Sequence, residues 1–190
     1  HVIYISISSG LSGSFNAIRL ALEDHPKLTS FVYDSKILAY PQGEIVLEVA
    51  KLIKEGTSFE EIVKEIPEIR KRIIGYFTIN TLEYLKKGGR IGRLAGTVGE
   101  LLNLKPIITT DEDGVFYNVV KVRGRKQSLS KMTELLKGYL AKGKCEVAVL
   151  HAGCEDEAIK YMNSLKDLTN VVSIKIAEIS PSLGIHGGPG

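Results

Sequence analysis

The stretch VIYISISSGLSGSF, residues 2–15, changes its pattern of apolar residues within a few positions. Val2–Ile7 alternates apolar side chains with Tyr4 and Ser6, and this period of two predicts a β-strand. From Phe15 onward the apolar residues recur at helical spacing, so residues 8–14 connect a strand directly to a helix. A strand that leads through a short polar loop into a helix is typical of α/β proteins.

The next residues repeat this order of elements. Ser30–Asp34 is predicted to be a short strand, and Glu44–Glu55 a helix with one apolar face. Ser58 and Glu61 have the spacing of a capping box, which predicts the start of a second helix. We expect Pro67 to interrupt or kink that helix. The alternation of strands and helices predicts a parallel sheet with right-handed crossovers.

The pattern changes near Ile73, where we place a domain boundary. The residues beyond it predict a strand at 73–79 and a short helix that Asn80 or Thr81 caps and residues 86–90 end. They further predict a short helix at about 94–103, a hairpin of strands at 105–109 and 115–122, a helix at 127–141, a strand at 146–151, a helix at 155–168 and a strand at 171–177. The expected fold class is therefore α/β with two lobes. Residues 1–72 form an incomplete N-terminal lobe with a parallel sheet, and residues 73–190 a C-terminal lobe with a mixed sheet.

Composition excludes several classes of protein. The 25 basic and 22 acidic residues leave a net charge of +3, which is too small to indicate nucleic-acid binding. We identify no membrane-spanning run and no signal peptide, and Cys145 and Cys154 are interpreted as reduced thiols. We therefore expect a cytoplasmic protein without a metal or cofactor. Because the chain begins at His1 and stops in a glycine-rich segment, we expect it to be truncated at both ends.

The loop at residues 8–14 is suited to binding an anion. The start of a helix presents unpaired N–H groups and the positive end of the helix dipole. Gly10 and Gly13 allow close backbone approach, and Ser9, Ser12 and Ser14 add hydroxyl donors, so a carboxylate or a phosphate would fit. Serine and glycine are also favoured here for capping and turning the chain, and this purely structural interpretation stays open.

A hydrolase is an alternative interpretation of the same loop. Gly10 to Ser14 differs from the nucleophile-elbow pattern G-x-S-x-G only at its last position. Ser12, then Asp111 or Asp113, then His186 would supply a nucleophile, an acid and a base in the order of the α/β-hydrolases. His186 lies between glycines in a segment that we expect to be irregular, where a histidine is either solvent-exposed or functional.

Two clusters of basic residues lie on predicted connections. The first is Lys86, Lys87, Arg90 and Arg93, and the second is Lys121, Arg123, Arg125 and Lys126. Neither cluster matches a nucleotide-binding fingerprint. Each is compatible with a solvated helix end, with phosphate binding or with an acidic partner surface.

Three segments together resemble the DegV family. SSGLSGSF at residues 8–15 is similar to its S-S-x-L-S-G-T-[YF] segment, LEYLKKGGRI at 82–91 to L-x-x-L-x-K-G-G-R-I, and LLNLKPI at 101–107 to L-L-x-[IL]-K-P-[IL]. The later KVR at 121–123 and HGGPG at 186–190 follow in the expected order. We expect the truncation to have removed the family's N-terminal T-S-Q-P segment, and Ser14 stands where the family usually has a threonine.

The resemblance implies a two-lobed α/β protein that holds a long-chain fatty acid in a tunnel between its lobes. It implies that Ser9, Ser12 and Gly13 bind the acyl carboxylate, with His186 close to it. It further implies a non-catalytic protein that presents the acid to a fatty-acid kinase for conversion to acyl phosphate. Arg90 and Arg123 would then contact that partner or a phosphate group.

Overall fold

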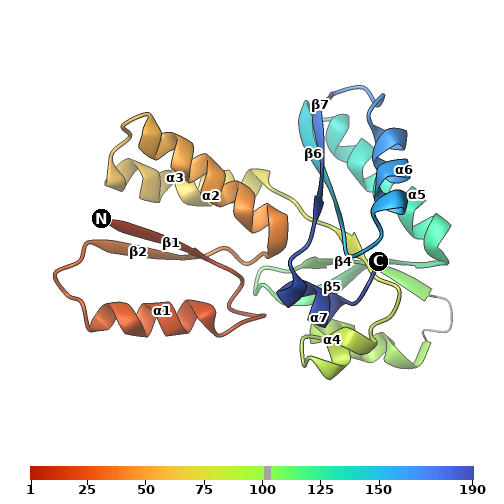
Figure 1. Cartoon of the computed structure of the whole chain (residues 1–190), viewed down its shortest axis with the longest axis horizontal. Coiled ribbons are helices and arrows are strands. Elements are labelled where there is room, and N and C mark those ends of the chain that lie inside the picture. The colour runs from red at the N-terminus through yellow and green to blue at the C-terminus, as the bar shows by residue number, and fades with distance from the viewer. Residues whose placement is uncertain (101–103) are drawn as a thin grey trace. The chain divides into compact units, whose positions relative to one another are not determined.

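The computed structural model describes residues 1–100 and 104–190, which form two compact units (Figure 1). The first unit comprises His1–Gly75 and Thr110–Val115, and the second comprises Tyr76–Thr109 and Phe116–Gly190. Residues 110–115 are separated in sequence from the rest of the first unit, and the division at residue 73 did not anticipate their place in it.

The first unit is built on two parallel strands. β1 (Val2–Ser6) pairs in parallel with β2 (Ser30–Asp34), and α1 (Ser14–Glu23) connects them. α2 (Ala39–Lys54) and α3 (Phe59–Arg72) follow, and Figure 1 shows them on the opposite side of the strand pair from α1. The predicted order and the parallel pairing are confirmed.

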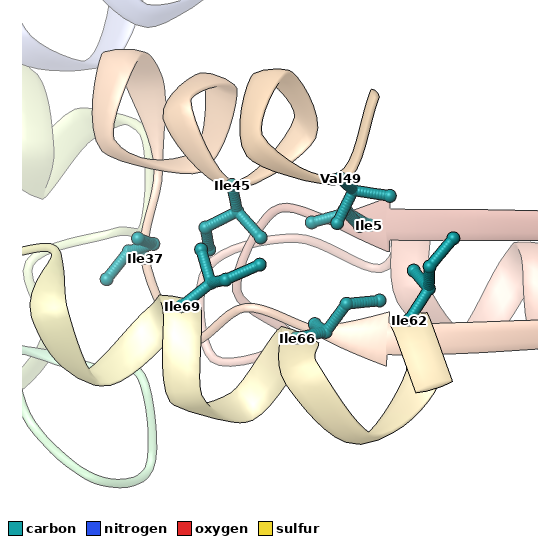
Figure 2. Packing of buried hydrophobic residues seen from close by; sticks show 7 residues of the cluster. All are labelled: Ile5, Ile37, Ile45, Val49, Ile62, Ile66 and Ile69. Atoms are coloured by element: carbon teal, nitrogen blue, oxygen red, sulfur yellow. The ribbon is translucent and has the colours of Figure 1, made fainter. Parts of the chain in front are cut away.

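The core of the first unit is almost entirely isoleucine. Figure 2 shows that side chains from β1, α2, α3 and the segment after β2 converge; they are Ile5, Ile37, Ile45, Val49, Ile62, Ile66 and Ile69. Residues three or four positions apart lie on one face of a helix, so α2 and α3 each direct one face toward the strands.

The start of α3 agrees with the sequence, whereas its interior does not. Ser58 Oγ accepts a hydrogen bond from the Glu61 N–H (3.4 Å), and the Ser58 N–H donates to Glu61 Oε2 (3.1 Å), which confirms the capping box. The helix continues through Pro67 to Arg72, so the prediction of an interruption is wrong. Proline inside a helix costs about 3 kcal/mol. Burial of Ile66 and Ile69 beside it offsets that cost, at roughly 1.5–3 kcal/mol for each side chain.

The second unit contains both antiparallel and parallel strands. β3 (Phe77–Thr78) is antiparallel to β4 (Leu104–Thr110), and β5 (Phe116–Arg123) is the other neighbour of β4. After α5 (Arg125–Leu140), β6 (Cys145–His151) and β7 (Val171–Glu178) form a parallel pair connected by α6 (Glu155–Leu165). The predicted α/β class with parallel and mixed pairing is therefore confirmed.

The shorter elements of the second unit depart from the predictions. The strand predicted at 73–79 is reduced to β3, and the predicted helix at 94–103 is a 3₁₀ helix over Gly92–Glu100; Leu101–Asn103 lie outside the described residues. α4 (Glu83–Lys87) is a short helix, as expected.

His186 does not lie in an irregular loop. It belongs to α7 (Pro181–Gly187), a helix that the glycines of this segment had obscured in the sequence. Pro181 occupies the first turn, where its fixed φ favours a helix and its missing N–H is not needed.

Candidate ligand-binding site

Ser8 anchors the loop between β1 and α1. It is fully buried, and its hydroxyl donates to the carbonyl of Gly114 (2.8 Å). Its N–H donates to the carbonyl of Ile37 (2.9 Å), and its own carbonyl accepts from the N–H groups of Leu11 and Ser12 (both 3.1 Å). With its hydroxyl and backbone committed in this way, Ser8 holds the loop in place and is not a ligand-binding group.

The two glycines of the loop have different surroundings. A Cβ at Gly10 would lie 2.8 Å from the carbonyl oxygens of Asp113 and Gly114, so this backbone packs against the turn between β4 and β5. A Cβ at Gly13 would meet nothing within 4 Å. The expectation that both glycines admit a ligand is therefore wrong for Gly10, which approaches the protein's own backbone, whereas the space at Gly13 is open.

Ser9 lies beside an ion pair whose two members, Asp34 and Lys36, were not among the predicted site residues. Its N–H donates to Asp34 Oδ1 (3.0 Å), and its hydroxyl oxygen accepts from the Lys36 ammonium (3.1 Å). Lys36 Nζ is also 2.9 Å from Asp34 Oδ2. Asp34 ends β2 as Ser6 ends β1, and the carboxyl ends of parallel strands meet at one edge of a sheet. This rule could have identified Lys36 from the sequence.

The Asp34 carboxylate is stabilised in its charged form. Burial by itself raises the pKa of Asp34, but hydrogen bonds from Ser9 and Lys36 outweigh it, so the pKa lies below its ordinary value. The charges of Asp34 and Lys36 compensate each other. An incoming carboxylate at Ser9 would meet a cation on one side and a charged acid on the other.

Ser12 and Ser14 form a hydroxyl pair at the start of α1. Their oxygens are 2.9 Å apart, and the Ser14 N–H donates to Ser12 Oγ (3.3 Å). The first intrahelical bond runs from the Ala17 N–H to the carbonyl of Gly13 (3.0 Å), so the N–H groups of Gly13 to Asn16 precede it. One of the two hydroxyl hydrogens bridges the pair, which leaves the other for a ligand. Gly13 is the N-cap of α1 and no side chain caps the helix, so the serine hydroxyls here turn the chain and do not cap it.

His186 belongs to the second unit, whereas Ser9, Ser12 and Gly13 belong to one loop of the first. The Nδ1 atom of His186 is enclosed and has no hydrogen-bond partner among the described residues. The imidazole lies against Gly88, just beyond α4.

Arg90 and Arg123 are both exposed in the second unit. Arg90 Nη1 donates to the carbonyl of Gly88 (2.6 Å), and Arg123 is the last residue of β5. The neighbouring Arg125 differs because its guanidinium binds both oxygens of Glu157 (3.2, 3.0 and 2.5 Å) and thereby lowers the pKa of that carboxyl. Arg125 is therefore engaged in a structural ion pair and is less exposed than Arg90 and Arg123.

The geometry of the first unit does not favour the hydrolase alternative. In the part of the chain that the structure describes, the hydroxyl of Ser12 is paired with Ser14, which is not a base. Asp111 Oδ1 accepts from the N–H groups of Asp113 and Val115 (both 3.0 Å) and so stabilises the turn. A catalytic serine needs a base within hydrogen-bond reach.

Over residues 1–100 and 104–190, no three His, Cys, Asp or Glu side chains come together as ligands of a metal ion. No helix in the same ranges combines the length and the hydropathy needed to cross a bilayer.

Comparison with known proteins identifies the family. The family model for uncharacterised proteins of the DegV family matches residues 1–190. A DegV domain-containing protein of Clostridium perfringens is 47% identical over 190 residues, which cover 100% of this chain and 68% of the relative.

Solved structures agree with this result. A fatty-acid-binding DegV family protein from Streptococcus agalactiae superposes with a TM-score of 0.89 at 32% identity, covering 100% of this chain and 67% of the other. The fatty acid kinase (Fak) B3 protein of Streptococcus pneumoniae, loaded with linoleic acid, superposes with a TM-score of 0.82 at 28% identity, covering 99% and 68%. The loop at the start of α1, the two-unit α/β architecture and these matches lead to one conclusion: the chain belongs to the DegV family.

Proposed function

We propose that this protein binds a long-chain fatty acid, with the carboxylate at the start of α1. The observation that carries the proposal is the group of donors there: the N–H groups that precede the first intrahelical bond, of which that of Ser14 already donates to Ser12, and the second hydroxyl hydrogen of the Ser12–Ser14 pair. The S. agalactiae and S. pneumoniae proteins, described as fatty-acid-binding and as loaded with linoleic acid, support a fatty acid as the anion.

Each group at this site has a distinct task. Gly13 leaves room for a carboxylate oxygen to approach the backbone, and Ser12 or Ser14 donates a hydroxyl hydrogen to it. Ser9 accepts from Lys36, so its own hydrogen is free to turn from Asp34 to a ligand. Neutral hydrogen-bond donors together with the positive end of the helix dipole stabilise the ionised form of the carboxylate.

The acyl tail supplies most of the affinity. Burial of a methylene group contributes about 0.8 kcal/mol, so a sixteen-carbon tail contributes on the order of 10 kcal/mol before the costs of association. Hydrogen bonds to a charged group contribute roughly 1.5–3 kcal/mol each. The donors therefore set the orientation of the ligand, and the tail distinguishes a fatty acid from a small anion.

The protein would act as a carrier that presents the bound acid to a fatty-acid kinase, which forms the acyl phosphate. The likeness to the Fak B3 protein supports this role. Arg90 and Arg123 are exposed cations suited to contact an acidic partner or a phosphate group, and His186 would contact the carboxylate or the phosphate donor. No covalent step is assigned to the protein itself.

The test is fatty-acid binding by delipidated protein, with palmitate as the probe and inorganic phosphate as competitor. Replacement of both Ser12 and Ser14 by alanine should weaken palmitate binding about ten-fold, because a hydrogen bond to the carboxylate is lost. Ser58→Ala is the matched control, since it also removes a serine hydroxyl at the start of a helix in the first unit, but at α3 and not at α1.

Two outcomes would refute the proposal. One is delipidated, folded protein that takes up no long-chain fatty acid. The other is displacement of palmitate by phosphate at comparable concentrations, which would indicate a site for small anions.

A further inference from the structure

α4 and α7 pack against each other in the second unit through two glycines. The His186 imidazole of α7 lies against Gly88, the C-terminal cap of α4. In turn, the Tyr84 ring of α4 lies against Gly188, which follows α7. Each helix thus receives a ring from the other, and the LEYLKKGGR and HGGPG segments form one local structure.

The glycine at position 88 is required by the imidazole and not by the backbone. Gly88 has φ −76° and ψ −4°, which any L-residue adopts readily, whereas Gly89 has φ +70° and needs glycine for its conformation. A Cβ at Gly88 would overlap Nδ1 of His186 and lie 3.1 Å from its Cε1. The absence of a side chain at 88 therefore creates the place that the ring occupies.

This position distinguishes the two ring nitrogens of His186. Nδ1 is enclosed and has no partner among the described residues. Nε2 is not among the enclosed, unpartnered side-chain atoms of the described residues, and the residue as a whole is only half-buried. A proton on Nδ1 would leave a buried donor without an acceptor and would have to fit against the Gly88 backbone. A proton on Nε2 leaves only a lone pair there, which tolerates a weak C–H contact.

We propose that Gly88 is a positioning residue that holds His186 as the tautomer protonated on Nε2, so that the accessible nitrogen is a hydrogen-bond donor suited to an acidic ligand group. The identity of that ligand group rests on the proposed function. The tautomer and its cause rest on the second unit alone. A fixed Nε2–H is a donor only, and a carboxylate oxygen is the acceptor that it fits.

The first test is the ¹⁵N NMR spectrum of the histidine side chains at about pH 9, where an ordinary imidazole is neutral. Nδ1 of His186 should show the shift of an unprotonated nitrogen and Nε2 that of a protonated one. His25 is exposed and supplies an internal reference in the same sample. A protonated Nδ1 at His186 in the unmodified protein would overturn the proposal without the need for any variant.

The second test compares Gly88→Ala with Gly184→Ala. Gly184 lies in α7 itself, and a Cβ there would meet nothing within 4 Å. Gly88→Ala should displace the imidazole, move the His186 shifts toward those of His25 and weaken palmitate binding about ten-fold. Gly184→Ala should leave both unchanged.

Each outcome can be assigned to one of the two proposals. An unchanged His186 spectrum in folded Gly88→Ala protein would overturn the role of Gly88. If the unmodified protein bound no fatty acid, the proposed function would fail, and the spectra would still test the tautomer and the effect of Gly88.

Discussion

Ser8→Ala is expected to destabilise the first unit by breaking the link between the loop and the turn at residues 110–115. Ser8 is fully buried, and its hydroxyl donates to the carbonyl of Gly114 (2.8 Å) and accepts from the N–H of Gly10 (3.1 Å). Gly10 is exposed, so water can replace the second bond, whereas Gly114 is buried and its carbonyl loses a donor. A buried group left without a partner costs roughly 1–3 kcal/mol, so we expect a loss of about 2 kcal/mol.

Urea-induced unfolding measures this loss, and Ser9→Ala is the control in the same loop. Ser9 accepts from a partly exposed Lys36, so its replacement should cost less than about 1 kcal/mol. Amide hydrogen exchange at Gly10 should accelerate in Ser8→Ala and not in Ser9→Ala. Equal losses of stability in the two variants would refute the structural role of Ser8.

Three further predictions follow from the charged and polar groups. Because the folded state lowers the pKa of Asp34, this carboxylate stabilises the fold above its unfolded pKa of about 4, and the stabilisation is lost as pH falls through the lower folded pKa. In Asp34→Asn the free energy of unfolding, measured from about pH 5 to 2, should therefore decrease less with falling pH. Arg90→Ala and Arg123→Ala should retain palmitate binding and reduce kinase-dependent phosphorylation, so loss of lipid uptake in a folded variant would contradict the docking role. His186→Ala should reduce acyl-phosphate formation, while p-nitrophenyl ester hydrolysis stays at background; robust hydrolysis lost in both His186→Ala and Ser12→Ala would favour the hydrolase instead.

Features that depend on neighbouring residues could be predicted from the sequence. The strand, loop and helix over residues 2–23 follow from a change of apolar period, and the capping box at Ser58 and Glu61 from their spacing. The interruption at Pro67 could not be excluded in this way. Its local penalty is offset by isoleucines that are buried only once α3 packs against α2 and the strands.

The residues of the candidate site could be predicted from the sequence only in part. The sequence indicated a loop of donors at the start of α1, since helix starts have unpaired N–H groups whatever the fold. It did not distinguish Ser8 from Ser12 and Ser14. The Ser8 hydroxyl donates to the distant Gly114 carbonyl, whereas the Ser12–Ser14 pair keeps one hydroxyl hydrogen for a ligand. Lys36 was not predicted, although its position just after β2, at the carboxyl edge of the parallel pair, could have indicated it.

The sequence by itself determined the α/β class, the family and the loop, because these depend on periodicity and on short motifs whose residues lie together in the chain. Only the tertiary structure decided which members of the motifs have which task. The bond from Ser8 to Gly114 joins residues 106 positions apart, and His186 contacts Gly88 across two separate helices. Such contacts engage some hydroxyls and glycines in tertiary packing and leave others able to contact a ligand. A local sequence pattern cannot predict this difference, because the partners lie far apart in the chain.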